Sequence, residues 1–480
     1  MKKKPASLSN SLARSLARLV GAENVLSRDE ARKRFSHDQY WYAIAAAAAG
    51  RAISRPDIAV RPRTAAQVAR ILRFANKSSV SVTPWGGGSG VQGAANADRG
   101  GIVLDLSRLS RVRMLDEKSQ SCEVEAGKVC RDFETELNAR GLSFTHYPAS
   151  TEWATIGGCV AARGSGVLST KYGKIEEHVL SLEFVTPTGE LVSTPCVPRH
   201  AAGPELTQLL VGSEGTLGVV TAARVKLHSL PKERVFGAFS FPDLRSGIEA
   251  GRRIMTSGLR PAVMRLYDQH AASHSLARAV EMNLPDATLV FMFDGDFPDL
   301  ARLEASKAME ACRSLGGGAL PSRLGEIWWD RRYVFYYPPY APELPSIWGT
   351  VDVVADFAHL EDVYQATTEA IRSAAGARWN LQLNTHFSHW YEWGSMIYAR
   401  MKIPQGPANL KQAKALHDRI FEKGVGAALR AGAVMNDHHG VGMRLAPYMK
   451  AQYGETLKTL QRIKRAMDPK GILCPGKLGL

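Results

Sequence analysis

Cysteine is sparse in this sequence, and long apolar runs are missing from it. The 480 residues include six cysteines, scattered without the C-x-x-C or zinc-ligand spacing of a disulfide framework or metal centre. This pattern favours a reduced, cytoplasmic protein. The most apolar run, AIAAAAAG at 43–50, is much shorter than the roughly 20 residues that span a bilayer. The basic N-terminus also lacks the continuous apolar core of a signal peptide.

Acidic residues are in the minority. The chain has 61 Lys and Arg against 46 Asp and Glu, a formal net charge of +15, which favours acidic ligands, anionic lipid headgroups or nucleic acid. No nucleic-acid-binding motif is present, so we expect a small-molecule substrate and no nucleic-acid partner. The basic N-terminal segment is typical of a solvated surface helix, with a membrane-surface helix as the alternative. Length and hydrophobic content predict two or more domains.

Glycine, by contrast, is abundant and concentrated. Three glycine-rich segments flanked by strand-like runs are TPWGGGSGVQGA (83–94), TIGGCVAARGSG (155–166) and LLVGSEGTLGVVT (209–221). Glycine allows backbone amides to approach a bulky anion such as a pyrophosphate. A tight turn or bulge explains any one segment better, but not all three together. Neither the P-loop nor the Rossmann motif fits, so the sequence predicts another dinucleotide cradle.

Further motifs extend this pattern: YPASTEWATIGG, KYGKIEEHVLSLEFVTPTGEL and the terminal IKRAMDPKGILCPGKL. In order and spacing the set resembles the FAD-binding domain of the vanillyl-alcohol oxidase / p-cresol methylhydroxylase flavoprotein superfamily. The resemblance implies an α+β fold, with a two-part FAD-binding domain and an antiparallel-sheet cap (substrate) domain with flanking helices. The expected units are an N-terminal helical segment (1–54), the FAD-binding domain (55–230), the cap (231–435) and a C-terminal segment that returns to the FAD domain and active site (436–480).

The resemblance implies FAD as the cofactor, and we expect it to be non-covalent because no histidine lies in the first glycine loop. Amides of that loop would wrap the pyrophosphate, and later motifs would hold the flavin, ribityl and adenosine parts. The implied cofactor-binding residues are Pro84, Trp85, Gly86, Gly87, Gly88, Ser89, Gly90, Ser150, Thr151, Thr155, Gly157, Gly158, Ser165, Gly166, Tyr172, Gly173, Ile175, Glu214, Gly215 and Val220.

Three segments of the expected cap domain and its C-terminal border contain unusual polar residues: AVMRLYD (262–268), SHWYEWGSMIYARMKI (388–403) and NDHHGVG (436–442). Arg265 lies in an apolar strand-like run, so it should pair with an acid such as Asp268 or face a ligand. His386 and His389 are more typical of satisfied strand histidines. The adjacent histidines at 438 and 439 indicate either a flavin-facing pair or a metal site.

These segments resemble the alkyldihydroxyacetonephosphate synthases of the same superfamily. The GHxGDGN run of metal-dependent D-lactate and glycolate oxidising relatives is missing, so we expect no metal. The resemblance implies that the acyl group of an acyl-dihydroxyacetone phosphate is exchanged for a fatty alcohol through an adduct on flavin N5. Tyr398 would be the base, His438 and His439 would lie near the flavin, and Arg265 would support the site. Asp437 replaces the first histidine of the family's triplet.

Two other functions compete with this one. The first is an FAD-linked oxidase or dehydrogenase acting on a 2-hydroxy acid or another small alcohol, and the second is a flavoprotein scaffold without turnover. The aromatic run at 326–342 could form an apolar wall, a membrane-facing lip or packed core. We expect a small-molecule substrate such as a lipid phosphate, peripheral contact with the inner membrane surface, and a homodimer.

Overall fold

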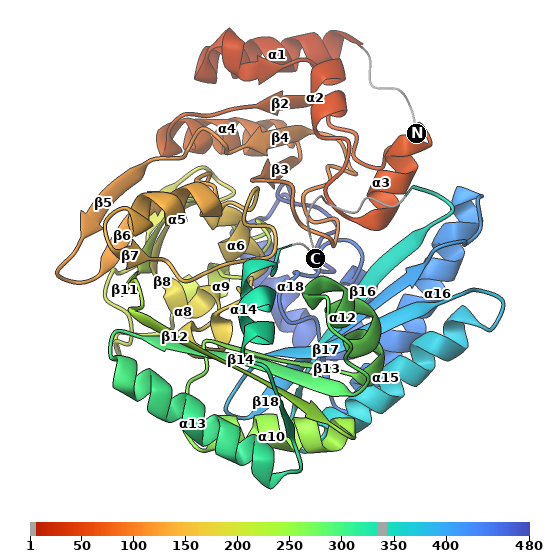
Figure 1. The fold of residues 1–480 in the computed structure, drawn as a ribbon. Coiled ribbons are helices and arrows are strands. Elements are labelled where there is room, and N and C mark those ends of the chain that lie inside the picture. Colours follow the sequence, from red (N-terminus) through yellow and green to blue (C-terminus); the bar gives the residue numbers. More distant parts are fainter. Residues whose placement is uncertain (1–5, 334–342) are drawn as a thin grey trace.

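The computed structural model describes residues 6–333 and 343–480. Figure 1 shows the cap, coloured green to blue, below the domain formed by the red-to-yellow segments. Three main sheets organise the chain. Among the described residues, no helix is long and apolar enough to cross a membrane. The aromatic run at 326–342 lies partly outside the described residues.

The first sheet has four strands in the order β1-β2-β4-β3, and β2, β3 and β4 run parallel. Helix α4 (Ala65–Ser78) connects β2 to β3 and buries Val68, Ile71 and Leu72 against the sheet beside α1 (Ala6–Val20). Thr64 begins α4 because its hydroxyl accepts the amide hydrogen of Gln67. The strands are β1 (Val25–Leu26), β2 (Ile58–Val60), β3 (Val82–Trp85) and β4 (Ile102–Asp105).

The second sheet is antiparallel, in the order β5-β6-β10-β8-β9. Its core is formed with Phe133 of α5 (Cys130–Asn138) and Ile156 of α6 (Ile156–Ala162). The strands are β5 (Val112–Asp116), β6 (Ser121–Glu125), β8 (Val179–Val185), β9 (Leu191–Ser193) and β10 (Val219–Lys226), and a separate pair is formed by β7 (Leu142–Ser143) and β11 (His228–Ser229).

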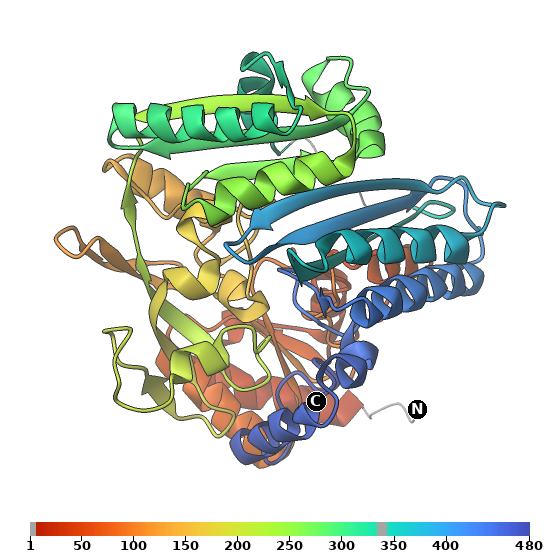
Figure 2. The same cartoon turned by 90° about the horizontal axis from the view of Figure 1, so that it is seen from below.

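The cap is an eight-stranded antiparallel sheet in the order β15-β12-β14-β13-β17-β18-β16-β19. Long helices cover one face and lie toward the viewer in Figure 2. The strands are β12 (Glu233–Phe241), β13 (Val263–Tyr267), β14 (Ala287–Gly295), β15 (Gly318–Leu320), β16 (Ile347–Asp356), β17 (Gln382–Trp390), β18 (Gly394–Ile403) and β19 (Val434–Met435). The helices of this face are α10 (Leu244–Thr256), α13 (Pro298–Ser314), α15 (Leu360–Ala375) and α16 (Leu410–Arg430).

The other face of the cap sheet looks toward the first domain. Strand alternation divides the side chains between the faces: Leu266 packs under the long helices, whereas Tyr267 packs on the opposite side. That side carries α14 (Arg323–Asp330) and a continuous helical segment at 269–280, formed by α11 (Gln269–Ala271), the π-helix η2 (Ala272–Leu276) and α12 (Ala277–Val280). The two domains therefore face each other across the part of this sheet face that these helices do not cover.

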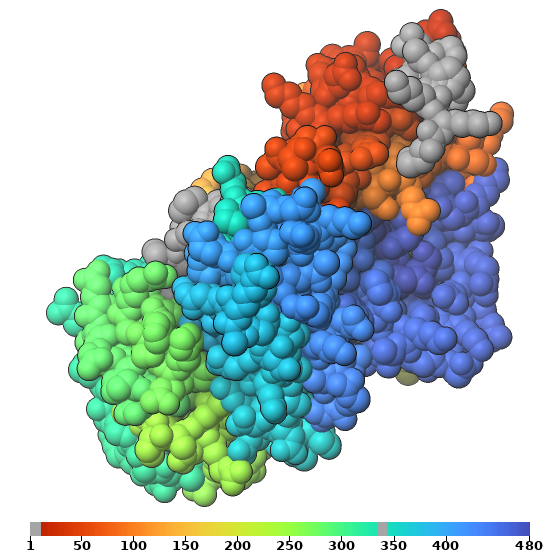
Figure 3. Space-filling view, turned by 90° about the vertical axis from the view of Figure 1, so that its right-hand side faces the viewer, coloured from red at the N-terminus to blue at the C-terminus, as the bar shows by residue number. Residues whose placement is uncertain are grey.

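The last 45 residues return to the first domain. Leu473 forms a parallel bridge with Val82, and the buried Lys464 ammonium pairs with Asp468. Figure 3 shows this blue C-terminal part against the red and orange N-terminal part. The remaining elements are η1 (Ala22–Asn24), α2 (Arg28–Arg34), α3 (Trp41–Ala48), α7 (Ser169–Tyr172), α8 (Ile175–His178), α9 (Leu206–Leu210), η3 (Ala446–Tyr448), α17 (Met449–Tyr453) and α18 (Thr456–Met467).

Candidate active site

A cavity of about 850 Å³ lies between the glycine-rich loops and the cap sheet. Its wall combines the loop after β3, the loops around α6 and strand β10 with the cap strands β13, β17 and β18. Its size is that of a pocket for a drug-sized or larger ligand. The site therefore lies where the sequence predicts the cofactor to meet the substrate.

The loop after β3 forms the cofactor end of the cavity. Within the described part of the chain, no amide from Gly86 to Gly90 donates to a protein acceptor, and all five residues line the cavity. Gly88 has φ +66°, a left-handed conformation that favours glycine. A Cβ on Gly90 would meet nothing within 4 Å and would have open space around it. Unpaired amides around an open space suit the phosphates of FAD.

Most of the predicted cofactor residues line this cavity, as do all four predicted catalytic residues. Glu214 is a buried acid in the wall, and burial raises its pKa to about 7. Its carboxylate accepts the amide hydrogens of Val441 and Gly442, so it also fixes the returning C-terminal segment. The lining residues from the prediction are Pro84, Gly86, Gly87, Gly88, Ser89, Gly90, Ser150, Thr155, Gly157, Gly158, Ser165, Gly166, Glu214, Gly215, Val220, Arg265, Tyr398, His438 and His439.

Five predicted cofactor residues do not line the cavity. The Trp85 ring packs edge-on against Phe35, with ring centroids 5.0 Å apart. The Tyr172 hydroxyl donates to Asp294 of the cap, over 2.8 Å. Thr151 is buried, and its carbonyl accepts the Arg131 amide hydrogen. Gly173 lies in a turn with φ +89°. Ile175 lies in the core of the second sheet. In this structure these five residues contact other protein groups and not the cavity, so their assignment to the cofactor stays a prediction.

The cap end is built on the β17–β18 pair, in which His386 lies opposite Tyr398. The two rings stack, with centroids 4.8 Å apart, and the Tyr398 ring lies 5.9 Å from that of His438. Burial, followed by the charge of Arg265, lowers the pKa of His386 well below its usual value. Tyr398 therefore faces the cavity among imidazoles, at least one of which is neutral at pH 7.

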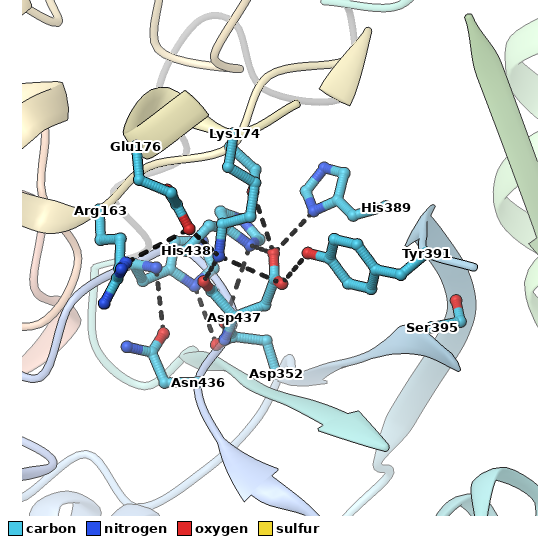
Figure 4. A network of polar contacts seen from close by, with 12 residues as sticks. Arg163, Lys174, Glu176, Asp352, His389, Tyr391, Ser395, Asn436, Asp437 and His438 are labelled. Atoms are coloured by element: carbon cyan, nitrogen blue, oxygen red, sulfur yellow. Dashed lines mark hydrogen bonds and ion pairs between the residues drawn. The ribbon is translucent and has the colours of Figure 1, made fainter. Parts of the chain in front are cut away.

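Asp437 organises the histidines behind this surface (Figure 4). Its carboxylate lies 2.8 Å from His389 Nδ1 and 3.0 Å from His438 Nδ1. It also accepts the Tyr391 hydroxyl over 2.6 Å, and the Lys174 ammonium is 3.5 Å away. Burial alone would raise the pKa of the Asp437 carboxyl, but the ammonium and the two histidine bonds hold it well below its usual range.

These contacts fix the tautomer of His438. Because a carboxylate accepts at Nδ1, that nitrogen carries the proton, and Nε2 is left with a lone pair for a ligand. Burial and the neighbouring His439 lower the pKa of His438 to about 4, so the ring is neutral at pH 7. His439 Nδ1 is held in turn by Asp352, over 2.9 Å. Asp437, which stands in place of the first histidine of the triplet, thus holds the rings of His389 and His438 in position.

The same groups have the composition of metal ligands. Their ligand atoms lie within 4.8 Å of one another in two triads, Asp352 with His438 and His439, and His389 with Asp437 and His438. In each triad a ring Nδ1 already bonds to a carboxylate. A metal ion at either place would have to displace these hydrogen bonds.

Arg265 lies on β13, buried, and faces the cavity. Its guanidinium lies 5.3 Å from the centre of the Trp328 ring, a cation–π contact. Asp268, the proposed partner, instead accepts the Ala271 amide over 2.7 Å and the Tyr364 hydroxyl over 3.0 Å. Arg265 therefore lies in the cavity wall, and Asp268 accepts hydrogen bonds from other groups.

Several cavity residues were missed by the sequence reasoning. Strand alternation carries a signal for two of them, because Arg400 and Lys402 follow Tyr398 at steps of two and so share its face. The segment at 269–280 gave no signal, since its contact with the cavity depends on long-range packing. The missed polar residues include His270, His274, Ser275, Arg278, Asn380, Gln382, Asn384, Arg400 and Lys402.

This architecture and cavity define an FAD-binding flavoenzyme of the vanillyl-alcohol oxidase / p-cresol methylhydroxylase superfamily, as the motifs predicted. Residues 56–195 match the family described as FAD binding domain, and residues 230–478 match FAD linked oxidases, C-terminal domain. The chain belongs to this family of FAD-linked oxidases.

Relatives with different activities are similar to the chain. Alkyldihydroxyacetonephosphate synthase of Trypanosoma brucei brucei is 29% identical over 88% of this chain and 73% of the relative. Mitochondrial D-lactate dehydrogenase [cytochrome] of Arabidopsis thaliana is also 29% identical, over 89% of this chain and 74% of the relative. A solved alkyldihydroxyacetonephosphate synthase structure shares the fold, with a TM-score of 0.79, 21% identity, and coverage of 99% of this chain and 86% of that chain.

Proposed function

We propose that this FAD-linked enzyme exchanges the acyl group of an acyl-dihydroxyacetone phosphate for a fatty alcohol. The observation that supports this reaction is the position of Tyr398, which faces the cavity on a cap strand beside the rings of His386 and His438. Once the Tyr398 hydroxyl has passed its own proton to a neighbouring base, its oxygen can take a proton from a carbon beside a ketone. The relative from Trypanosoma brucei brucei, which is similar over 88% of this chain, is named alkyldihydroxyacetonephosphate synthase.

The surrounding residues fit this role. When bound, FAD supplies an electrophilic ring system at the end of the cavity that the glycine loops define. The Arg265 guanidinium can stabilise negative charge on a substrate oxygen. The neutral His438 ring offers Nε2 as a proton acceptor, while Asp437 holds its Nδ1. Proton transfer can therefore proceed among side chains of the cap.

The experiment is exchange on the FAD-loaded enzyme. Palmitoyl-dihydroxyacetone phosphate and radiolabelled hexadecanol are supplied without air, and we expect labelled ether lipid and released palmitate without lasting bleaching of the flavin. Failure to form the ether, together with bleaching by a hydroxy acid, would refute the exchange reaction. A surface variant such as Arg253→Gln, which removes a cation paired with Glu249 on α10, serves as the control.

A second candidate is oxidation of a small polar alcohol or 2-hydroxy acid. It is favoured by the cap wall, which among the described residues contains mostly polar side chains and few apolar ones, such as Trp348, Leu381 and Met396. A D-lactate dehydrogenase is as similar to the chain as the synthase. Stopped-flow bleaching of the flavin by D-lactate or a related substrate, within the turnover time, would establish this function instead.

A further inference from the structure

The cavity wall beyond Tyr398 is cationic. Arg400 and Lys402 of β18 and Arg278 of α12 line it. Among the described residues the lining includes a single carboxylate, that of Glu214, which lies on the cofactor side and is occupied by two backbone amides. A ligand in this part of the cavity therefore meets positive charge without a competing acid.

Strand register orders these groups along the cavity. Tyr398 lies opposite His386, Arg400 opposite Asn384, and Lys402 opposite Gln382. All six residues line the cavity, so the alternate positions of both strands form a ladder of polar pairs. At about 3.4 Å per residue, the Arg400 position lies about 7 Å along the strand from Tyr398, and the Lys402 position about 14 Å from it.

The helical segment at 269–280 approaches this ladder from the side. The Arg400 guanidinium donates to the Ser275 hydroxyl over 3.0 Å, which ties the strand to the π-helix. The rings of His270 and His274 lie 4.2 Å apart and, with Arg278, continue the cavity lining along the segment. Donors from two separate elements therefore converge on one space.

Among the described residues, these cations have no acidic partner. In the described part of the chain, Arg278, Arg400 and Lys402 form no ion pair, whereas Lys171 and Lys174 nearby pair with Asp294 and Asp437. The segments outside the description, 1–5 and 334–342, contain no Asp or Glu. Grouped cations in a partly enclosed site repel one another, and a bound anion would relieve that repulsion.

We propose that Arg400, with Arg278, Lys402 and the Asn384 amide, forms a binding site for the phosphate group of a phosphate monoester. The planar guanidinium suits phosphate oxygens, and several donors suit a dianion. This proposal deepens the proposed function and rests on it for the placement of the reacting carbon at Tyr398. The spacing favours a substrate whose phosphate lies several bonds from that carbon. A monocarboxylic 2-hydroxy acid such as lactate has its only carboxylate on the reacting carbon and would not extend to this wall.

The first test is binding without turnover. FAD-loaded wild type is titrated with inorganic phosphate, glycerol 3-phosphate and D-lactate, by calorimetry and by the flavin absorbance change. We expect glycerol 3-phosphate to bind, and Arg400→Gln to weaken it by about tenfold or more. Arg278→Gln and Lys402→Gln should weaken it less, Arg400→Lys should restore part of the affinity, and Arg253→Gln on the outer helix should have no effect.

The outcomes separate the subsite from the reaction. If Arg400→Gln keeps its FAD and its melting temperature yet binds glycerol 3-phosphate as tightly as wild type, the subsite is refuted, even if exchange proceeds. If binding depends on Arg400 but no exchange occurs, the subsite stands and the proposed function fails. Preference for D-lactate over both phosphates would also overturn the subsite.

A second comparison identifies the source of the phosphate. Glycerol 3-phosphate in buffer is compared with a long-chain acyl-dihydroxyacetone phosphate in mixed micelles. If the phosphate group provides the binding energy, Arg400→Gln should weaken both by a similar factor. A loss confined to the acylated compound would show that Arg400 acts on the chain or the micelle, and would refute the phosphate assignment.

Discussion

The two ends of the cavity are built from different parts of the chain. The cofactor end is built around main-chain amides of the loop from Gly86 to Gly90, which no protein acceptor occupies within the described residues, and the loops around α6 and strand β10 complete it. The cap end is made by side chains of β13, β17, β18 and the C-terminal segment, which are far apart in sequence. One end depends on the lack of side chains, whereas the other depends on which side chains are present.

This difference suggests that the main-chain end supplies cofactor binding, which a family can share, and that the side-chain end supplies substrate chemistry, which can differ between its members. Backbone amides can bind phosphate groups in any sequence that keeps the glycines. Side chains on a fixed pair of strands can change from one enzyme to another without altering the fold. Substitutions at the cap end should therefore change chemistry and leave FAD bound, and substitutions at the loop should do the reverse.

The largest expected effect is at the cap end. Tyr398→Phe should lower the exchange rate about a thousandfold, about 4 kcal/mol, because it removes the proposed proton acceptor. Its FAD content should equal that of wild type, measured by absorbance after gel filtration. Tyr364→Phe is the matched control, since its hydroxyl bonds to Asp268 behind the sheet. Loss of FAD from the Tyr398 variant would contradict the expectation that substitutions at the cap end leave FAD bound.

Asp437→Asn should have the next largest effect. The substitution removes the buried carboxylate 3.5 Å from the Lys174 ammonium and leaves that ammonium only the longer contact with Glu176, at 4.0 Å. We expect the free energy of unfolding of the FAD-loaded protein to fall by about 3 kcal/mol, measured in urea. Asp418→Asn removes the exposed partner of Lys414 and should cost less than about 1 kcal/mol. Equal losses would show that the Asp437 network adds nothing to stability.

The sequence predicts the residues of the cofactor end more completely than those of the cap end. The first glycine loop is local, and the residues that its motif names, from Gly86 to Gly90, all line the cavity, whereas Tyr172 and Ile175 of a later motif do not. Arg400 shares a face with Tyr398 by alternation, but the sequence does not tell which face borders a cavity. The Asp437 network joins loops and strands near 174, 389 and 437, and no short-range pattern predicts that meeting.

Gly90→Ala tests the cofactor end with a smaller effect. Its Cβ would clash with no protein atom, since nothing lies within 4 Å, but it would enter the space assigned to the phosphates. We expect unchanged unfolding of the cofactor-free protein and FAD binding weaker by about 1–3 kcal/mol, measured by fluorescence quenching. Gly426→Ala within helix α16 is the control and should leave FAD affinity unchanged. Unaltered FAD binding by the Gly90 variant would place the phosphates elsewhere.

The smallest effect concerns acid stability, which should reside in the cap end. The pKa of His438 is lowered to about 4, so between that pH and its unfolded value near 6.5 only the unfolded chain takes up the proton. Stability should therefore fall as the pH falls through this window, by at most about 1.4 kcal/mol per pH unit for one proton. His438→Gln should reduce the slope of unfolding free energy against pH by up to that amount.

The control is His359→Gln, which alters a half-exposed ring on the outer side of the cap. This variant removes a histidine without altering the network of His438 and Asp437, so a change of slope that occurs only in His438→Gln is due to that network. An equal slope in the His438 variant and in wild type would mean that the proton is taken up by another group. In that event the buried His438 ring would not account for the acid sensitivity of the cap end. The glycine loop at 86–90 contains no side chain that titrates in this range, so it could not account for it either.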